Sequence, residues 1–209
     1  MERELKFLLA SPHLPALPHG YLAGTAQPSK HVLDEYLDFR GQILSAGWRL
    51  RRRRSDGQAV RYTLKAERAP SASGPLSERA EIERTPVAHE ELPAEIATEL
   101  TSAGIDLPYV RSRLQSYLTL RQERQAFALT YEGSEVAVLS IDTVRASGSG
   151  SEVECRWSEL EIEFLDSITP EVRERAVSEL APWLAAQEGV TAAGQSKVAR
   201  AADLLSIAL

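Results

Sequence analysis

Polar and apolar residues alternate along much of this chain of 209 residues, a pattern typical of β-strands whose two faces have different surroundings. The alternation predicts strands over residues 2–10, 48–54, 60–67, 78–85, 117–131, 135–144 and 152–165. Residues 31–39 fit a strand or one short helix, and their β-branched and aromatic content favours a strand. Ser55-Asp56-Gly57 indicates a hairpin turn between two of these strands.

Predicted helices are few, and none begins before residue 90. Residues 90–103 look helical, with Gly104 as a C-terminal stop. Thr169-Pro170-Glu171 combines a capping hydroxyl, a proline in the first turn and an acid near the positive end of the helix dipole. This helix should extend to about residue 187, and a last helix should begin near Ser196.

Segments rich in Pro, Gly and Ser are predicted to be loops. They cover residues 11–30, 69–77 and 147–151. Many strands and few helices predict one antiparallel, barrel-like α+β domain over residues 1–209.

Charged residues occupy every second position in several predicted strands. The sets that share a strand face are Glu2, Glu4 and Lys6; Arg49, Arg51 and Arg53; Thr63 and Lys65; Arg79, Glu81 and Glu83; and Glu159, Glu161 and Glu163. An antiparallel sheet with one solvated face commonly shows such alternation. The alternative is a barrel with apolar side chains outward under helices and a polar tunnel inside. Whole faces of one sign favour the tunnel, because a solvated face usually mixes signs.

Composition restricts the class of protein. The net charge of −6 argues against a general nucleic-acid binder. The single cysteine, Cys155, excludes an intramolecular disulfide and fits a reducing compartment. No apolar run approaches the ~18 residues of a membrane helix, and the amino terminus does not resemble a signal peptide. These features predict a cytoplasmic protein that does not enter a membrane.

The candidate ligands are oxygen atoms. Carboxylates on alternate positions suit Mg²⁺ or Mn²⁺, and lysine or arginine beside them suits phosphate. The four histidines are scattered, so no zinc site is expected. The chain has no G-x-x-x-x-G-K-[ST] loop, so a P-loop mode of phosphate binding is excluded.

Taken in order, these motifs resemble those of the CYTH superfamily, the triphosphate tunnel metalloenzymes. The similar segments are Glu2-x-Glu4-x-Lys6, Tyr36-Leu37-Asp38, Leu50–Arg53, Thr63–Lys65, Arg79–Glu83, Arg124–Phe127, Ile141-Asp142, Glu159–Glu163 and Ser196-Lys197. The resemblance implies an eight-stranded antiparallel β-barrel, or tunnel, with flanking helices. Two choices stay open: Arg121 or Arg124 after the central helix, and which of the three late glutamates belong to the site.

The resemblance also implies roles for individual residues. Catalytic and phosphate-binding roles fall to Lys6, Arg51, Arg53, Lys65, Arg124 and Lys197, with Arg79 as a further substrate-binding residue. Metal-binding roles fall to Glu2, Glu4, Glu81, Glu83, Asp142, Glu159, Glu161 and Glu163, with two Mg²⁺ or Mn²⁺ ions entering with the substrate. Six inner bases and six inner acids predict a nearly neutral empty tunnel, which favours a metal–triphosphate complex over the bare anion.

The implied function is a divalent-metal-dependent triphosphatase that hydrolyses a short linear triphosphate, with inorganic triphosphate as first choice. Alternatives on the same fold are an adenylate cyclase of the class IV type and a thiamine triphosphatase. A different class is a non-catalytic module that binds polyphosphate or nucleotide. The expected partner is a small molecule containing a triphosphate, not nucleic acid or a membrane, and the chain is expected to be a monomer or a homodimer.

Overall fold

The computed structural model describes residues 2–66, 76–79, 81–86 and 92–207, without the side chains of residues 2, 3 and 76–79. The strands are β1 (Glu2–Leu9), β2 (Tyr21–Ala23), β3 (Lys30–Asp38), β4 (Trp48–Ser55), β5 (Arg61–Ala66), β6 (Leu76–Arg79), β7 (Glu81–Arg84), β8 (Gln115–Tyr131), β9 (Ser134–Gly148), β10 (Glu154–Phe164) and β11 (Val190–Ala192). The helices are α1 (Gln42–Ser45), α2 (Ala94–Ser102), α3 (Leu107–Arg111), α4 (Pro170–Ala185) and α5 (Lys197–Leu205).

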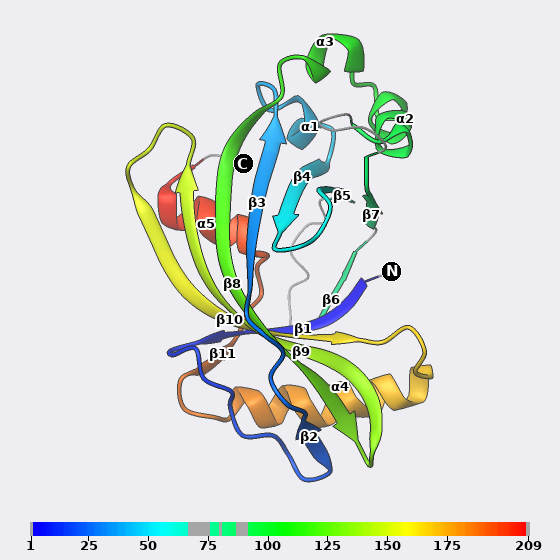
Figure 1. Cartoon of the computed structure of the whole chain (residues 1–209), viewed down its shortest axis with the longest axis vertical. Coiled ribbons are helices and arrows are strands. Elements are labelled where there is room, and N and C mark those ends of the chain that lie inside the picture. Colours follow the sequence, from blue (N-terminus) through cyan, green and yellow to red (C-terminus); the bar gives the residue numbers. More distant parts are fainter. Residues whose placement is uncertain (1, 67–75, 80, 87–91, 208–209) are drawn as a thin grey trace.

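All described strands belong to one antiparallel sheet, which confirms the predicted α+β class (Figure 1). Its main path runs β11-β1-β10-β9-β8-β3-β4-β5-β7, with β2 on β8 and β6 on β1. Strands β6 and β7 are separated by residue 80 alone, and they pair with β1 and β5 respectively. The prediction of a closed barrel with eight strands therefore needs correction. The sheet has eleven described strands. Among the described residues no single strand pairs with both β1 and β5, so no continuous ladder closes the sheet.

Most predicted elements are confirmed, including a strand over most of residues 31–39 and the hairpin of β4 and β5. All three predicted loops include strand residues, and the loop 11–30 contains β2 and the first residue of β3. Strand β6 begins at Leu76, inside the predicted loop 69–77, whose residues 69–75 lie outside the described part. Strand β9 continues to Gly148, because Ser147 is paired with both β8 and β10 and this ladder outweighs a small, polar composition. The short elements β2, β11, α1 and α3 were not predicted.

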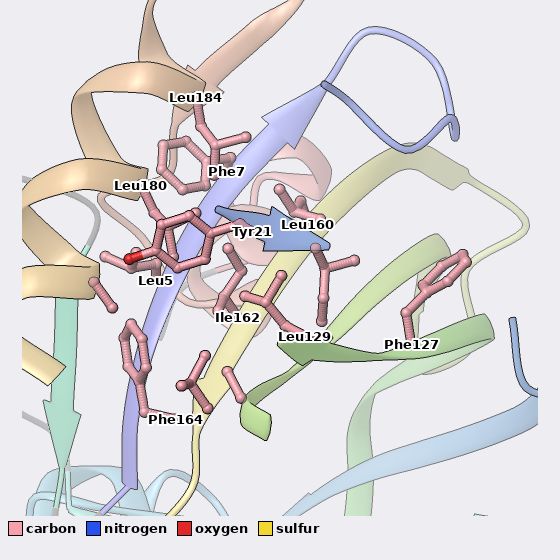
Figure 2. Packing of buried hydrophobic residues seen from close by; sticks show 14 of the residues in the cluster. Leu5, Phe7, Tyr21, Phe127, Leu129, Leu160, Ile162, Phe164, Leu180 and Leu184 are labelled. Atoms are coloured by element: carbon pink, nitrogen blue, oxygen red, sulfur yellow. The ribbon is translucent and has the colours of Figure 1, made fainter. Parts of the chain in front are cut away.

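The largest apolar cluster lies on the outer face of the sheet. Leu5 and Phe7 of β1 and Ile162 of β10 pack with Leu180 and Leu184 of α4 (Figure 2). These residues alternate with the charged positions of the same strands. The apolar side of each strand is therefore turned outward and covered by a helix, as the tunnel hypothesis predicted.

Helices cover two further apolar regions. Helices α2 and α3 pack on the outer side of β4 and β5, around Leu50 and Leu64. Helix α5 instead packs on the inner side, where Val198 and Ala201 contact a cluster that includes Leu118 and Leu120 of β8. Helix α5 therefore fills one part of the sheet's interior with apolar side chains. None of the described helices is long and apolar enough to cross a membrane.

Candidate active site

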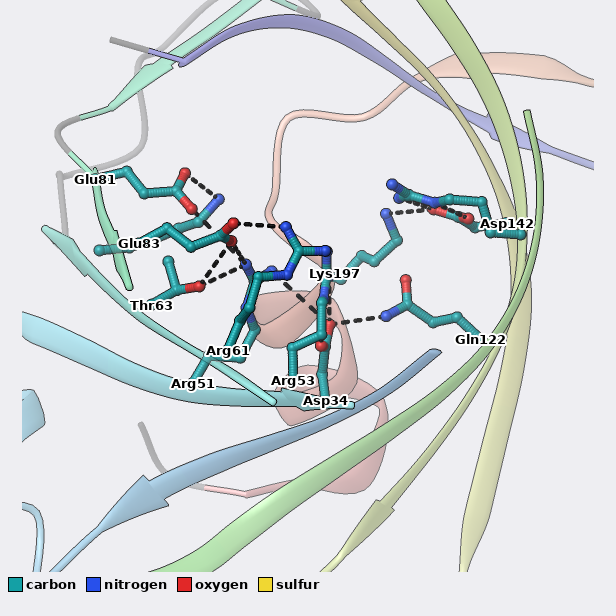
Figure 3. Close-up of polar contacts among 12 residues, drawn as sticks. Asp34, Arg51, Arg53, Arg61, Thr63, Glu81, Glu83, Gln122, Asp142 and Lys197 are labelled. Carbon is teal, nitrogen blue, oxygen red and sulfur yellow. Dashed lines mark hydrogen bonds and ion pairs between the residues drawn. The ribbon is translucent and has the colours of Figure 1, made fainter. Parts of the chain in front are cut away.

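A cavity of about 460 Å³ lies among the inner faces of the strands and the first turn of α5. Figure 3 shows many of its side chains and the contacts between them. Its basic lining residues are Lys6, Arg49, Arg51, Arg53, Arg61, Lys65, Arg124 and Lys197. Its acidic lining residues are Glu4, Asp34, Glu81, Glu83, Glu161 and Glu163. Asp142 and Glu159, buried beside the cavity against Lys197, bring the described acids to eight, equal to the eight described bases, so the charges balance as predicted from the sequence.

The structure brings together most of the predicted site residues. Those that line the cavity are Lys6, Arg51, Arg53, Lys65, Arg124, Lys197, Glu4, Glu81, Glu83, Glu161 and Glu163. Asp142 and Glu159 are fully buried beside the cavity, where both contact Lys197. Glu2 and Arg79 are paired in the ladder of β1 and β6, but their side chains lie outside the described part. Arg121 is exposed on the opposite face of β8, so Arg124 is the arginine that reaches the cavity.

Three charged residues that the sequence analysis did not select also line the cavity: Asp34, Arg49 and Arg61. Each lies two positions from a residue that was quoted in a motif, namely Tyr36, Arg51 or Thr63. Strand periodicity places residues two apart on the same face. The signal was therefore present. Arg49 already belonged to the alternating set of Arg51 and Arg53 but was given no role, and the same periodicity extends from Thr63 to Arg61 and from Tyr36 to Asp34.

Asp34 holds Arg53 in a two-pronged contact. Arg53 donates from Nε and Nη2 to the two carboxylate oxygens of Asp34, each at 2.7 Å. Gln122 of β8 donates to Asp34 at 2.8 Å, and Arg51 lies 3.8 Å away. Burial alone would raise the pKa of Asp34, but the neighbouring arginines lower it to about 2. Asp34 is therefore ionised at neutral pH and fixes the orientation of Arg53.

A second group of contacts joins β4, β5 and β7. Arg51 donates to the Thr63 hydroxyl at 2.9 Å and lies 3.6 Å from Glu83. Arg61 donates to Glu83 at 2.7 Å, and Lys65 contacts Glu81 at 2.9 Å. Each of these inner bases has an acid from a neighbouring strand within 4 Å, which for Arg51 is Asp34 of β3.

The third group joins the long strands to α5. Arg124 donates from Nε and Nη2 to Asp142, at 2.7 and 2.6 Å, and from Nη2 to Glu161 at 2.6 Å. Lys197 donates to Glu161 and lies 3.0 Å from Asp142 and 3.3 Å from Glu159. Burial opposes ionisation of Glu161, but Lys197, Lys6 and Arg124 hold its pKa well below the ordinary range. The same carboxylates raise the pKa of Lys197 against the effect of its burial.

Strand β1 contributes an acid and a base. Lys6 lies 2.7 Å from Glu4 and 3.7 Å from Glu161. Burial by itself would lower the pKa of Lys6, but these two carboxylates raise it above the ordinary value. Glu4 also stands directly opposite Glu163 of β10 in the ladder, and both side chains line the cavity.

The start of α5 is fixed by a shared hydroxyl. Ser196 is the N-cap residue, and its Oγ accepts from the backbone N–H of Ala199 at 3.3 Å. The same oxygen accepts from Nη1 of Arg49 on β4 at 2.9 Å. The contact connects the cap of α5, and with it the position of Lys197, to the strand that carries Arg51 and Arg53.

The predicted metal ligands are distributed around the cavity and not gathered at one point. Among the residues with described side chains, no three Asp, Glu, His or Cys are arranged to hold a metal ion. The cross-strand pair of Glu4 and Glu163 nevertheless fits a divalent ion. The two carboxylates stand opposite each other in the ladder, Glu4 also lies 2.7 Å from Lys6, and carboxylate oxygens are the ligands that Mg²⁺ and Mn²⁺ prefer.

Comparisons with known proteins agree with this architecture. A CYTH domain model matches residues 1–190 of the sequence. No protein with a curated description matches it. A solved structure from Hippeastrum, described as a candidate adenylyl cyclase with a dominant triphosphatase activity, is 18% identical with a TM-score of 0.56. The alignment covers 98% of this chain and 97% of that one.

Two further structures are less similar. The PH1819 protein from Pyrococcus horikoshii OT3 is 18% identical over 85% of both chains, with a TM-score of 0.44. A candidate adenylate cyclase from Vibrio parahaemolyticus is 16% identical over 85% of both chains, with a TM-score of 0.38. At these identities, the likeness to the Hippeastrum structure supports the fold alone. The domain match covers almost the whole chain, and on that basis this chain belongs to the CYTH family.

Proposed function

We propose that this protein is a divalent-metal-dependent triphosphatase that hydrolyses a short linear triphosphate in the cavity, with inorganic triphosphate as the preferred substrate. The observation that carries the proposal is the lining itself, in which bases from β1, β4, β5, β8 and α5 surround one enclosed space. A compact anion with several negative charges is the ligand that such a lining would stabilise.

The bases have complementary tasks in this proposal. Arg51, Arg53 and Arg124 would bind phosphate oxygens in the two-pronged manner that guanidinium groups favour, and Lys6 and Lys65 would act as point charges. Arg53 donates two N–H groups to Asp34, which fixes the orientation of its guanidinium group. Its remaining N–H groups can then bind phosphate oxygens. Lys197, on the first turn of α5, would contact the terminal phosphate.

The reaction in this proposal is an in-line displacement. The oxygen of a water molecule forms a bond to the terminal phosphorus, the bridging P–O bond breaks, and pyrophosphate leaves with its electron pair. The water proton passes to solvent. Arg51, Arg124 and Lys197 would stabilise the charge that spreads over the phosphoryl oxygens. Glu161 stays ionised because of its lowered pKa, and it keeps Lys197 and Arg124 aligned.

Mg²⁺ or Mn²⁺ would be held by Glu4 and Glu163, with Glu161 beside them, on the side of the cavity formed by β1 and β10. When bound, the ion would neutralise negative charge on the phosphate oxygens and make a water molecule more acidic. Oxygen ligands and a balance of acids and bases around the cavity suit a metal that shares its coordination with substrate phosphates.

Inorganic triphosphate is preferred over a nucleotide because the lining offers no surface for a base. Tyr36 is the one aromatic residue among the described residues that line the cavity. Its ring is nearly buried and packs against Tyr117, with ring centroids 6.4 Å apart. Stacking of adenine needs an accessible aromatic face. This argues against the cyclase alternative.

The test is a phosphate-release screen on metal-stripped protein to which Mg²⁺ or Mn²⁺ is returned. The substrates are inorganic triphosphate, thiamine triphosphate, ATP and long polyphosphate, and formation of cyclic AMP is measured in parallel. Lys6→Met is the test variant, and Lys30→Met, which removes an exposed lysine, is the matched control. We expect kcat/KM for triphosphate to fall by about 100-fold in Lys6→Met and to stay unchanged in Lys30→Met.

Three outcomes would contradict the proposal. Cyclic AMP as the main product from ATP would identify a cyclase. Tight binding of triphosphate without turnover in either metal would identify a binding module. Faster release of phosphate from thiamine triphosphate than from inorganic triphosphate would identify thiamine triphosphate as the preferred substrate.

A further inference from the structure

The outer face of the sheet carries a second concentration of basic residues, away from the cavity. In Figure 1, α1–α3 lie at one end of the molecule and α4 at the other, with the long strands β3 and β8 running between them. Along this middle region the outward side chains of β8 and β9 include Arg121 and Arg145, both exposed. The apolar clusters of the sheet do not include these positions.

Four exposed arginines form one row across neighbouring strands. Arg121 of β8 stands directly opposite Arg145 of β9, which stands opposite Arg156 of β10. On the other side, Leu33 of β3 stands opposite both Arg121 and Arg54 of β4. Cross-strand partners share a face of the sheet and lie about 5 Å apart at Cβ, where like charges are destabilising. The arginine row, Arg54, Arg121, Arg145 and Arg156, therefore carries a repulsion that a bound anion would remove.

Arg54 and Arg156, at the ends of the row, each pair with a glutamate, whereas the central Arg121 and Arg145 have no such partner among the described residues. Arg54 lies 3.5 Å from Glu35, and Arg156 lies 3.0 Å from Glu154. Within the described part of the chain, neither Arg121 nor Arg145 makes an ion pair or a side-chain hydrogen bond. Their donors are available to a ligand.

A hollow of about 560 Å³ lies against this row. Arg54, Arg121 and Arg145 line it, with Leu33 between them. Two carboxylates also line the hollow. Asp56 is occupied by His31, whose backbone N–H and ring Nδ1 lie 2.9 and 3.0 Å from its Oδ2. Glu123 stands in the next row, opposite His31. The arginines thus retain an excess of positive charge, in a protein whose net charge is −6.

The chemistry of the lining selects the class of anion. Guanidinium groups pair with phosphate oxygens through two parallel hydrogen bonds. Arg121 and Arg145 lie on adjacent strands, about 4.8 Å apart, and Arg54 lies one further strand away beyond Leu33, an extended arrangement that suits an anion with several linked phosphates. His31 is the sole ring among the described lining residues, so a nucleobase would find no aromatic platform.

We propose that this hollow is a second anion site, separate from the cavity, which binds a short inorganic phosphate chain through Arg54, Arg121 and Arg145. Binding there needs no metal and no turnover, so the site does not depend on the proposed function.

Equilibrium dialysis of inorganic tripolyphosphate in EDTA tests the proposal. Arg121→Gln/Arg145→Gln removes the two arginines that lack an acid. Arg40→Gln/Arg175→Gln removes two exposed charges elsewhere and is the matched control. Lys6→Met weakens the cavity. We expect the dissociation constant of tripolyphosphate at the outer site to rise at least about tenfold in Arg121→Gln/Arg145→Gln. It should stay unchanged in the control and in Lys6→Met.

Equal binding by wild type and Arg121→Gln/Arg145→Gln would overturn the proposal. The same loss in both double variants would also overturn it, because it would show a general effect of net charge. Tighter binding of single-stranded DNA than of tripolyphosphate, lost with Arg121 and Arg145, would refute the assignment to a phosphate chain. Turnover of triphosphate is measured in the same samples, so a failure of the proposed function is seen separately.

Discussion

At the scale of single residues, the cavity is a set of buried charges held by opposite charges from other strands. Asp34 illustrates the balance, because burial disfavours its ionised form while Arg51 and Arg53 favour it. The arginines outweigh burial, since the charge-assisted hydrogen bonds from Arg53 are short and aligned. The same balance keeps Glu161 ionised beside Lys197. These acids therefore act as rigid supports that hold the phosphate-binding bases.

Asp34→Asn should destabilise the protein at neutral pH. Because the folded-state pKa of Asp34 is lowered to about 2, its ionisation stabilises the fold above the ordinary pKa near 4. This contribution is lost as pH falls from about 4 to about 2. We expect the free energy of unfolding to fall by about 2 kcal/mol at pH 7, with the difference from wild type shrinking below pH 4.

Urea unfolding at pH 7 and at pH 3 measures this effect, with the exposed Asp56→Asn as control. An equal loss of stability in Asp34→Asn at both pH values would show that the ionisation of Asp34 is not its source.

Glu4→Gln tests the carboxylate on the metal side of the cavity. The amide keeps a hydrogen-bond acceptor for Lys6 but removes the negative charge opposite Glu163. We expect turnover with Mg²⁺ or Mn²⁺ to fall by about two orders of magnitude while thermal unfolding changes little. The measurement is a titration of phosphate release against metal concentration. Unchanged turnover and metal dependence would remove Glu4 from the metal site.

At the scale of elements, strand parity decides which side chains enter the cavity, and one helix completes it. On β4, Arg51 and Arg53 face inward while Leu50 packs outward under α2 and α3. Helix α5 contributes Lys197 from the far end of the chain, and its cap at Ser196 is bonded to Arg49. The position of Lys197 therefore depends on the start of α5.

Removing the cap of α5 and, separately, the cap of α4 distinguishes an effect on the position of Lys197 from an effect on the stability of the protein. Ser196→Ala and Thr169→Ala each remove a hydroxyl that accepts a backbone N–H, at α5 and α4 respectively. Each should lower the free energy of unfolding by about 1 kcal/mol. We expect Ser196→Ala alone to lower kcat, by about tenfold, because Lys197 shifts when the contact with Arg49 is lost. Equal kcat values in the two variants would show that this contact does not position Lys197.

At the scale of the whole molecule, the apolar clusters under α4 and under α2 and α3 lie on the side of the sheet opposite to the charged cavity. The apolar surface that the outer clusters bury stabilises the fold and offsets the cost of the charged interior. Stability and chemistry are therefore separable in this molecule.

Leu180→Ala should test this separation. Leu180 is fully buried between α4 and the outer face of the sheet. Its truncation should cost roughly 2–5 kcal/mol of stability through lost contacts and a residual cavity. Turnover measured well below the unfolding temperature should stay near that of wild type. Leu22→Ala, at an exposed position, is the control, and a large loss of turnover in folded Leu180→Ala would contradict the separation.

The sequence by itself determined the strand and helix positions of most of the fold and the face on which each charge lies. It could do so because alternation is a local property of the strand backbone. It did not identify Asp34 or Arg49 as site residues, and it did not show that β6 pairs with β1 while β7 pairs with β5.

Only the tertiary structure decided which acid meets which base. Asp34 and Gln122, or Lys197 and Glu161, are far apart in the chain and meet through strand register and helix packing. A shift of one residue in register would turn every side chain of a strand to the other face. The physical reason is that ion pairing depends on distances of a few ångströms between distant segments, and no local pattern encodes them.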